Sequence, residues 1–331
     1  MNMVCLQFVT IDVFTTQPYT GNPLAIVFLP PNKDEADLSH GQKQLIASEF
    51  NLSETVFLHP GSADGEQAKG KIRKIDIFTT ESELPFAGHP TIGAASWLLC
   101  LSPDEMKSGL VETLNTKSGN IPIQQVKSAE GPSTAVTASV AHNVRIHAAS
   151  YPLQKLLKIH PPLAAFFPSE GYEQEAVGFP IVSIVNGMTQ VHVELPSLDA
   201  LAAVGISASG SNGAVECGYL DKGWESGLVL TYFYVRGVED PLMGKQVIRA
   251  RSIVGNIEDP ATGSAASGLA AYLTLVKGNS GQHHYDIVQG VEMGRRSDLG
   301  IEVVTKEKGK IESVELQGAA VAVSEGRILV P

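Results

Sequence analysis

The chain has 331 residues and a net charge of −11, with 43% hydrophobic and 18% charged residues. This length corresponds to about two domains, and the hydrophobic content excludes a disordered chain. Acidic charge without a run of Lys or Arg argues against nucleic acid or an anionic membrane as a partner. No apolar run reaches the roughly 20 residues of a membrane helix, and no secretory signal is recognisable. We therefore expect a soluble, cytoplasmic protein, whose distant cysteines Cys5, Cys100 and Cys217 form neither a disulfide framework nor a metal site.

The N-terminal half is predicted to consist mainly of short strands. Residues 6–14 and 24–29 are rich in β-branched and aromatic side chains, which favours two strands joined by a long connection. Ser39 is a suitable N-cap for a helix over 39–50. Residues 52–58 return to strand, and the alternation of Ile with charge in 71–78 indicates a half-buried strand. Another hairpin is predicted at 110–115 and 120–126.

The C-terminal half continues this pattern. A helix over 152–167 is interrupted by two prolines, and Asn186-Gly187 is a strong turn signal for a hairpin between 181–185 and 189–195. A short helix is expected over 197–204. Because few helices alternate with the strands, a Rossmann or TIM-barrel fold is disfavoured and mostly antiparallel strands are expected. Further strands are predicted near 214–220, 227–235, 285–289, 301–305, 311–316, 319–323 and 327–330.

An eight-residue pattern occurs twice in the chain. Residues 89–96 read His-Pro-Thr-Ile-Gly-Ala-Ala-Ser, and residues 259–266 read Asp-Pro-Ala-Thr-Gly-Ser-Ala-Ala. The two copies lie 170 residues apart, about half of the chain, and each leads into an apolar helix. This placement predicts that one domain has been duplicated.

Each copy also predicts a helix start. Proline suits the first helical position, so His89 and Asp259 are expected as caps of helices that begin near Pro90 and Pro260. Both helices are apolar or small on every side, which predicts that they are buried within sheet. Buried helix starts that point into a cleft would offer free N–H groups to a small carboxylic acid. Two capped core helices without any ligand are the alternative interpretation.

Glu54 is a candidate for proton transfer. In the predicted strand over 52–58 it shares a face with Leu52, Val56 and Leu58. Burial in an apolar row would raise the pKa of this carboxyl group toward neutrality, which suits a general acid/base, although a donor such as His89 could pull it back. A Glu at a strand end in solvent is the alternative.

His89 and Asp259 would complete an acid/base set if they share one cleft with Glu54. His89 could bind or protonate a substrate, and Ser264 with the neighbouring Gly263 N–H could receive a carboxylate. Ordinary helix caps are the alternative for both copies. The chain contains no nucleophile elbow, Walker A motif or GxGxxG motif, and its histidines have no known metal spacing.

Five segments together resemble the PhzF-like proteins of the phenazine biosynthesis family. They follow in order across almost the whole chain, and ELPFAGHP and DPATGSA are the most specific motifs among them. The five segments are IDVFTTQPYTGNPLAIVF (11–28), NLSETVFL (51–58), FTTESELPFAGHPTIGAA (78–95), EDPATGSAASG (258–268) and VQGVEMGRRS (288–297).

The resemblance implies an α+β fold related to diaminopimelate epimerase. That fold has two similar domains, each an antiparallel barrel-like sheet around a central helix, with the active site between them. Applied to this chain, it predicts one domain at 1–142 plus 318–331 and another at 143–317. It also implies a homodimer that uses neither a metal nor an organic cofactor.

The resemblance further implies an isomerase. The enzyme that names the family moves a proton on a dihydro-hydroxyanthranilate with a Glu in the NLSET motif, which is Glu54 here. By the same motifs His89 and Asp259 are expected as catalytic residues. The expected substrate-binding residues are Asn22, Gly88, Gly263 and Ser264.

Two departures restrict this inference to a class of reaction. The loops near 59–70, 128–134 and 160–175 are longer than in a compact member, and loops often determine specificity, so the substrate stays open. Related epimerases use two cysteines at the helix starts, where this chain has none, so an amino-acid epimerase or racemase is disfavoured. We expect a cofactor-independent proton shift on a small carboxylic acid. A non-catalytic metabolite-binding protein with the same pocket is the alternative.

Overall fold

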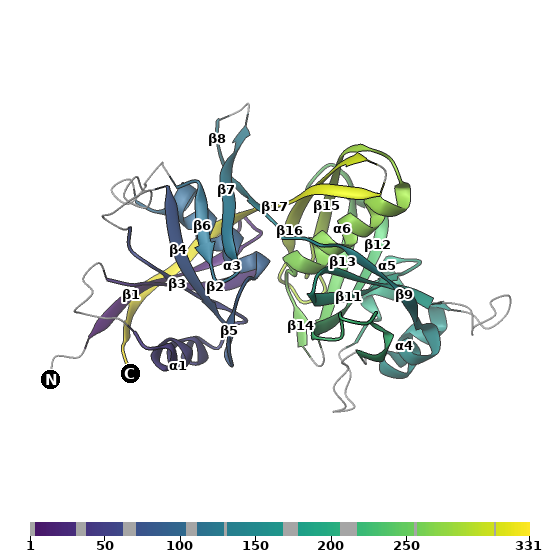
Figure 1. Ribbon diagram of the computed structural model, residues 1–331, viewed down its shortest axis with the longest axis horizontal. Coiled ribbons are helices and arrows are strands. Elements are labelled where there is room, and N and C mark those ends of the chain that lie inside the picture. Colours follow the sequence, from purple (N-terminus) through teal and green to yellow (C-terminus); the bar gives the residue numbers. More distant parts are fainter. Residues whose placement is uncertain are drawn as a thin grey trace. The chain divides into compact units, whose positions relative to one another are not determined.

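The computed structural model describes residues 4–30, 38–61, 71–103, 111–128, 131–167, 178–205, 217–254, 257–307 and 309–331 (Figure 1). Most of the loop predicted at 59–70, parts of those at 128–134 and 160–175, and the start of the strand predicted at 214–220 lie outside these ranges. The chain divides into two compact units: unit 1 comprises residues 1–140 and 316–331, and unit 2 comprises residues 141–315. In the described part of the chain, no helix has the length and apolar character needed to span a membrane.

Unit 1 is built mainly of strands. Its elements are β1 (Cys5–Val13), β2 (Asn22–Phe28), α1 (His40–Phe50), β3 (Thr55–Leu58), β4 (Ile72–Phe78), β5 (Glu83–Leu84), α3 (Gly88–Ser96), a π-helical turn η1 (Trp97–Leu101), β6 (Thr113–Thr116), β7 (Gly119–Ser128), β8 (Gly131–Ser139) and the part of β17 (Lys310–Leu329) from residue 316 onward.

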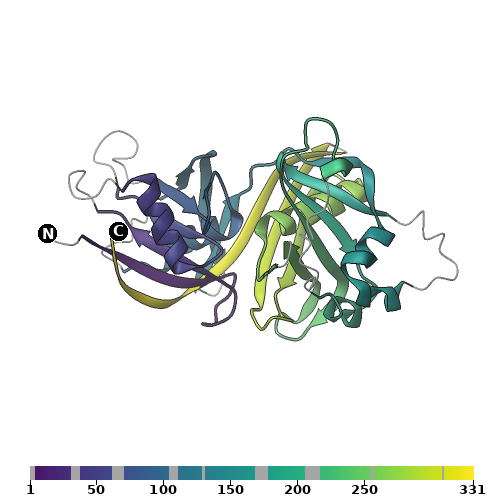
Figure 2. The same cartoon turned by 90° about the horizontal axis from the view of Figure 1, so that it is seen from below.

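The strands of unit 1 form a closed sheet. β1 pairs antiparallel with both β17 and β2, and Figure 2 shows the yellow β17 beside the purple β1. β2 runs parallel to β3, β3 antiparallel to β4, and β4 parallel to β6. β6, β7 and β8 follow antiparallel, and β8 pairs again with β17. The sheet is therefore mixed, not antiparallel as expected, because β2 reaches β3 through the crossover helix α1 and β4 reaches β6 through α3.

Helix α3 lies inside this sheet. All nine of its residues are buried, as predicted, and it packs on β1, β2, β3, β7 and β8. The approach is close because Gly93 has no side chain: a Cβ there would lie 2.3 Å from Leu24 Cδ2. Helix α1 covers the opposite face of the sheet, where Ile46 packs with Phe57 and Phe78 (Figure 2).

Unit 2 has a comparable set of elements. They are β9 (Arg145–Pro152), α4 (Leu153–Ile159), a 3₁₀ turn η2 (Pro161–Phe166), β10 (Gly178–Val185), β11 (Gly187–Glu194), α5 (Leu198–Ala202), a 3₁₀ turn η3 (Cys217–Tyr219), β12 (Gly227–Asp240), β13 (Lys245–Val254), β14 (Ile257–Asp259), α6 (Gly263–Lys277), β15 (Gly281–Gln289), β16 (Ser297–Glu307) and the first residues of β17.

The strand pairings of unit 2 repeat those of unit 1. Strand β10 pairs antiparallel with β11, and β11 runs parallel to β12. β12 pairs antiparallel with β13, β13 runs parallel to β15, and β15 pairs antiparallel with β16. The same order runs from β1 to β7 in unit 1. The β10–β11 hairpin turns at Asn186-Gly187 as predicted, with a φ of +93° at Gly187. Helix α6 packs on β10, β11, β15 and β16, and eleven of its residues are buried.

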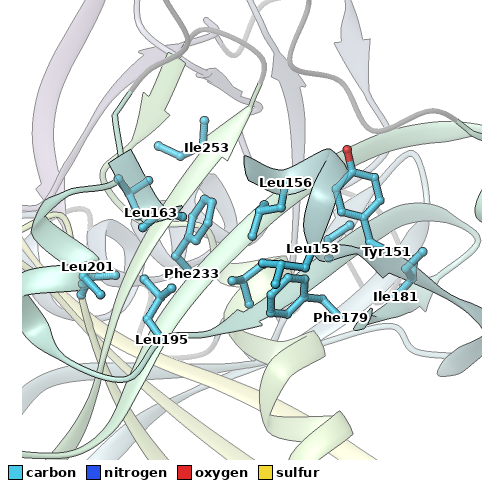
Figure 3. Close-up of a cluster of buried hydrophobic side chains, with 14 of the residues drawn as sticks. Tyr151, Leu153, Leu156, Leu163, Phe179, Ile181, Leu195, Leu201, Phe233 and Ile253 are labelled. Atoms are coloured by element: carbon cyan, nitrogen blue, oxygen red, sulfur yellow. The ribbon is translucent and has the colours of Figure 1, made fainter. Parts of the chain in front are cut away.

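A second apolar layer covers the face of this sheet that points away from α6. Leu156 of α4, Leu163 of η2 and Leu201 of α5 pack with Ile181 and Phe233 of the strands (Figure 3). The sheet is thus buried on both faces, with the central helix on one side and short helices on the other. Such close packing holds the strands on which α6 packs in fixed positions.

Candidate active site

Glu54 lies in the short turn between α1 and β3. Asn51 ends α1 in the left-handed conformation (φ 51°), and the strand begins only at Thr55. The prediction that Glu54 lies within a strand is therefore wrong by one residue. Its side chain is 18% exposed, so the carboxylate is partly enclosed but still accessible to a small molecule.

His89 contacts Glu54 directly. Helix α3 begins at Gly88 with Ala87 in the N-cap position, so His89 lies in the first turn and not at the cap as predicted. The imidazole is 4% exposed, and its Nδ1 lies 3.0 Å from Glu54 Oε2. On its other side Nε2 lies 3.2 Å from the carbonyl oxygen of Pro23.

The Pro23 carbonyl determines which ring nitrogen of His89 carries a hydrogen. A carbonyl oxygen can only accept, so Nε2 must be protonated and donates to it. The contact between Nδ1 and Glu54 Oε2 then contains one further proton, held by either atom. The pair is an imidazolium with a carboxylate, or a neutral imidazole with a carboxylic acid. In both forms it has a proton that can be exchanged with a ligand.

The pKa of Glu54 lies below its ordinary value. Burial raises this pKa, as the sequence predicted, but the charge of His89 and hydrogen bonds from His89 and Ser53 lower it further than burial raises it. The rise expected from burial is therefore outweighed by His89, the donor that was expected to pull this pKa back. At neutral pH Glu54 is a carboxylate, the form that accepts a proton.

In unit 2, Asp259 precedes α6 and does not cap it. The helix begins at Gly263 with Thr262 in the N-cap position. Asp259 instead ends the short strand β14, which pairs with the preceding strand β13, and α6 starts three residues beyond Pro260. The Asp259 carboxylate accepts a hydrogen bond from the Thr262 hydroxyl, with 2.6 Å between Oδ2 and Oγ1.

The first turn of α6 has no side-chain cap. Thr262 belongs to the residue types that usually supply one, but its hydroxyl donates to Asp259. The first bond within the helix runs from Ala266 N to Thr262 O at 3.0 Å, so the N–H groups of Gly263 and Ser264 precede it. Free N–H groups and the positive end of the helix dipole favour an anion here.

The remaining predicted residues lie close to these groups within their own units. Gly88 begins α3 beside His89, and Asn22 begins β2 next to Pro23, with its side chain 1% exposed. Among the described residues, no three His, Cys, Asp or Glu side chains gather into a metal-binding cluster.

Gln289 was not among the predicted site residues. This side chain is fully buried at the end of β15 and contacts both Asp259 and Thr262. The available signal is an amide within the apolar run Ile287-Val288-Gln289-Gly290, since a polar group in a buried strand needs specific partners.

The family that the motifs indicate is confirmed by comparison with known proteins. The phenazine biosynthesis-like protein family matches residues 11–326. A trans-2,3-dihydro-3-hydroxyanthranilate isomerase of Pseudomonas aeruginosa is 30% identical, over 97% of this chain and 98% of its own length. An uncharacterised isomerase of Mesorhizobium japonicum is 31% identical, over 96% of this chain and 97% of its own. The chain belongs to the phenazine biosynthesis-like family, and it is an isomerase.

Solved structures share the fold. A PhzF-family phenazine biosynthesis protein of Bacillus anthracis superposes with a TM-score of 0.70 at 23% identity, covering 99% of this chain and all of that one. A hydroxyproline epimerase of Agrobacterium vitis superposes with a TM-score of 0.58 at 12% identity, covering 98% of this chain and 93% of that one. These superpositions confirm the expected similarity to epimerase-type structures at the level of the fold.

Proposed function

We propose that this isomerase shifts a proton on a small carboxylic acid, with Glu54 as general acid/base and His89 as its proton partner. The observation that carries the proposal is the 3.0 Å contact between His89 Nδ1 and Glu54 Oε2, with Nε2 committed to the Pro23 carbonyl. This arrangement keeps Glu54 ionised while leaving a proton donor next to it. A base that must take a proton and later return it needs both properties.

The reaction is a transfer of one proton between two carbons of the substrate. Glu54 takes the proton from an acidic carbon next to an unsaturated or carboxylated group, and the electron pair of the broken C–H bond delocalises into that group. The same proton, or one exchanged with His89, is returned at another carbon. The substrate carboxylate would bind the N–H groups of Gly263 and Ser264, and Asp259 would accept a hydrogen bond from a substrate amino or hydroxyl group. The substrate must then carry a carboxylate and a group that can donate a hydrogen bond.

The substrate class follows from this requirement and from the relatives. The Pseudomonas aeruginosa relative is named for trans-2,3-dihydro-3-hydroxyanthranilate, which carries a carboxylate, an amino group, a hydroxyl group and ring unsaturation. We take cyclic, unsaturated amino or hydroxy acids as the class to test. The longer loops near 59–70, 128–134 and 160–175 are where we expect the substrate of this chain to be distinguished from that of its relatives.

We also infer that the chain consists of two similar domains, 1–142 plus 318–331 and 143–317, produced by duplication. Support comes from the shared order of strand pairings and from the position of the repeat. The copies at 89–96 and 259–266 lie at the two central helices, α3 and α6. Each helix follows a short strand, β5 or β14, that pairs antiparallel with the strand before it.

The test of the proposed chemistry is deuterium exchange. The wild type is incubated in D₂O with trans-2,3-dihydro-3-hydroxyanthranilate and a panel of cyclic unsaturated acids, and NMR measures deuterium at carbon. Glu54→Gln keeps the shape but removes the base, so exchange should fall at least about 100-fold. Glu49→Gln changes an exposed Glu of α1 five residues earlier and should exchange like the wild type. Equal exchange by wild type and Glu54→Gln would remove Glu54 from the mechanism.

A further inference from the structure

The side-chain amide of Gln289 makes four hydrogen bonds at the start of α6. Its Nε2 donates to the backbone carbonyl of Asp259 at 2.7 Å and to the Thr262 hydroxyl at 3.2 Å. Its Oε1 accepts from the Thr262 backbone N–H at 3.2 Å and from the Tyr232 hydroxyl at 2.9 Å. Gln289 and Tyr232 are both completely buried.

These partners permit only one orientation of the amide. The Asp259 carbonyl can only accept, so it must face Nε2, and the Thr262 N–H can only donate, so it must face Oε1. Both donors and both acceptor positions of the amide are then occupied. Burial and the nearby charge of Asp259 raise the pKa of Tyr232, which keeps its hydroxyl protonated as the fourth partner. No other side chain of this length carries two hydrogen-bond donors and two acceptor positions on atoms bonded to the same carbon.

The direction of the hydrogen bonds extends to the Asp259 carboxylate. The Thr262 hydroxyl accepts from Gln289, so its own hydrogen is available for Asp259 Oδ2, 2.6 Å away. A hydroxyl engaged on both sides does not turn toward the first turn of α6, which agrees with the missing side-chain cap. Gln289 thus has two effects. It orients the Asp259 carboxylate, and it leaves the N–H groups of Gly263 and Ser264 without a side-chain cap.

We propose that Gln289 is a positioning residue, which orients the Asp259 carboxylate through Thr262 and keeps the first turn of α6 open for the substrate carboxylate. This inference rests on the proposed function of Asp259 and α6. The competing explanation is that Gln289 only anchors β14 to β15 and contributes to stability. The two explanations differ in what happens when the Thr262 hydroxyl alone is removed, because β14 keeps its backbone contacts in that variant.

Four variants separate the two explanations. Gln289→Met keeps the length of the side chain and removes all four hydrogen bonds. Thr262→Val removes only the hydroxyl, and Thr262→Ser restores it. Gln282→Met is the matched control, because Gln282 is an exposed residue of the same strand whose amide donates to the surface residue Glu302.

The first measurement is backbone hydrogen exchange, which needs no substrate. Gln289→Met should speed exchange of peptides covering 258–266 by at least about 10-fold, because the Thr262 N–H and the Asp259 carbonyl both lose their partner. Gln282→Met should leave these peptides unchanged. Unchanged exchange in Gln289→Met would overturn the proposal whatever the substrate is.

The second measurement is turnover of the acid that the wild type isomerises. Gln289→Met and Thr262→Val should each lower kcat at least about 10-fold with KM changed less than about 3-fold, and Thr262→Ser should be close to wild type. The double variant Gln289→Met/Thr262→Val should lose no more than the worse single variant, since both act through one hydroxyl. Full kcat in Thr262→Val, or additive losses, would overturn the proposal in favour of a stabilising role. If the wild type isomerises no acid, the proposed function fails instead, and hydrogen exchange still decides whether Gln289 fixes the start of α6.

Discussion

A single backbone carbonyl shapes the chemistry of Glu54. Because Pro23 occupies Nε2 of His89, the imidazole must use Nδ1 toward Glu54. Pro23 belongs to the Gly-Asn-Pro motif before β2, so this segment contributes to the site through its main chain. Short motifs predicted that Glu54 and His89 lie close together, whereas the contact of His89 Nε2 with the Pro23 carbonyl depends on packing that the motifs do not contain.

Replacing His89 should reverse the direction of the Glu54 pKa shift. In the wild type this pKa is held below its usual value of about 4.3, so the acidic limb of kcat/KM should lie below that pH. In His89→Asn the attraction of the imidazolium is lost and burial dominates, so the pKa rises and the limb moves to higher pH. Carbon-13 NMR titration of the Glu54 carboxyl measures the same change directly. A limb at the same pH in both proteins would contradict this account of the pair.

At the scale of elements, local signals were sufficient in some places and insufficient in others. Ser39 was predicted to cap α1, and the structure shows a full capping box between Ser39 and Gln42 because all its partners lie within one turn. The start of α6 was placed too early because the short strand β14, in which Asp259 pairs with Ser252 of β13, was not predicted. Gln289 was missed because its partners Asp259, Thr262 and Tyr232 lie 27 or more residues away in the sequence.

The close packing of α3 can be tested with two glycines. In Gly93→Ala the new Cβ would lie 2.3 Å from Leu24 Cδ2 and 3.0 Å from Val13 Cγ2, both fully buried, so the free energy of unfolding should fall by about 1–3 kcal/mol. Gly41→Ala is the matched control in α1, where nothing lies within 4 Å. There the higher helix propensity of Ala should raise the free energy of unfolding by up to about 1 kcal/mol. Urea unfolding measures both, and the same sign for the two variants would contradict the packing described for α3.

Asp76 links α1 to the sheet of unit 1 through an ion pair, and it should make the stability of this unit depend on pH. Its Oδ2 lies 2.5 Å from Lys43 Nζ of α1 and 2.7 Å from His59 Nε2. Burial raises the pKa of Asp76, but hydrogen bonds and charges from His59 and Lys43 lower it well below the usual range. A depressed pKa adds stability above the unfolded value of about 3.9, and this stability is lost as pH falls toward the folded pKa. In Asp76→Asn, the free energy of unfolding at pH 7 should be lower by about 1–3 kcal/mol than in the wild type. Between pH 5 and pH 3 the variant should lose less of its stability than the wild type does. An unchanged pH dependence would exclude Asp76 as the cause.

At the scale of the whole molecule, the two units differ in how the chain builds them. Unit 2 is one continuous segment, residues 141–315, whereas unit 1 needs both ends of the chain. The reason is β17, whose C-terminal part pairs with β1 from Cys5↔Leu329 to Val13↔Ala320. The repeat in the sequence predicted two similar halves, and the family resemblance assigned residues 318–331 to the first of them. The pairing of β17 with β1 is the physical reason for such a division.

This difference predicts how pieces of the chain should fold. Residues 141–315 alone contain the strands β9 to β16, helix α6 and the apolar cluster of Figure 3, so this fragment should unfold cooperatively with native-like hydrogen-exchange protection in α6. Residues 1–140 alone lack the partner of β1 and leave an open, apolar sheet edge, so they should aggregate or stay unfolded. Joining residues 1–140 to 316–331 through a flexible Gly-Ser linker restores that partner and should recover a cooperative transition. Circular dichroism and urea titration of the three pieces measure these outcomes. If residues 141–315 do not fold alone, the two-domain proposal is wrong, because duplication of one domain requires units that fold independently. Folding of residues 1–140 without β17 would contradict the role given to that strand.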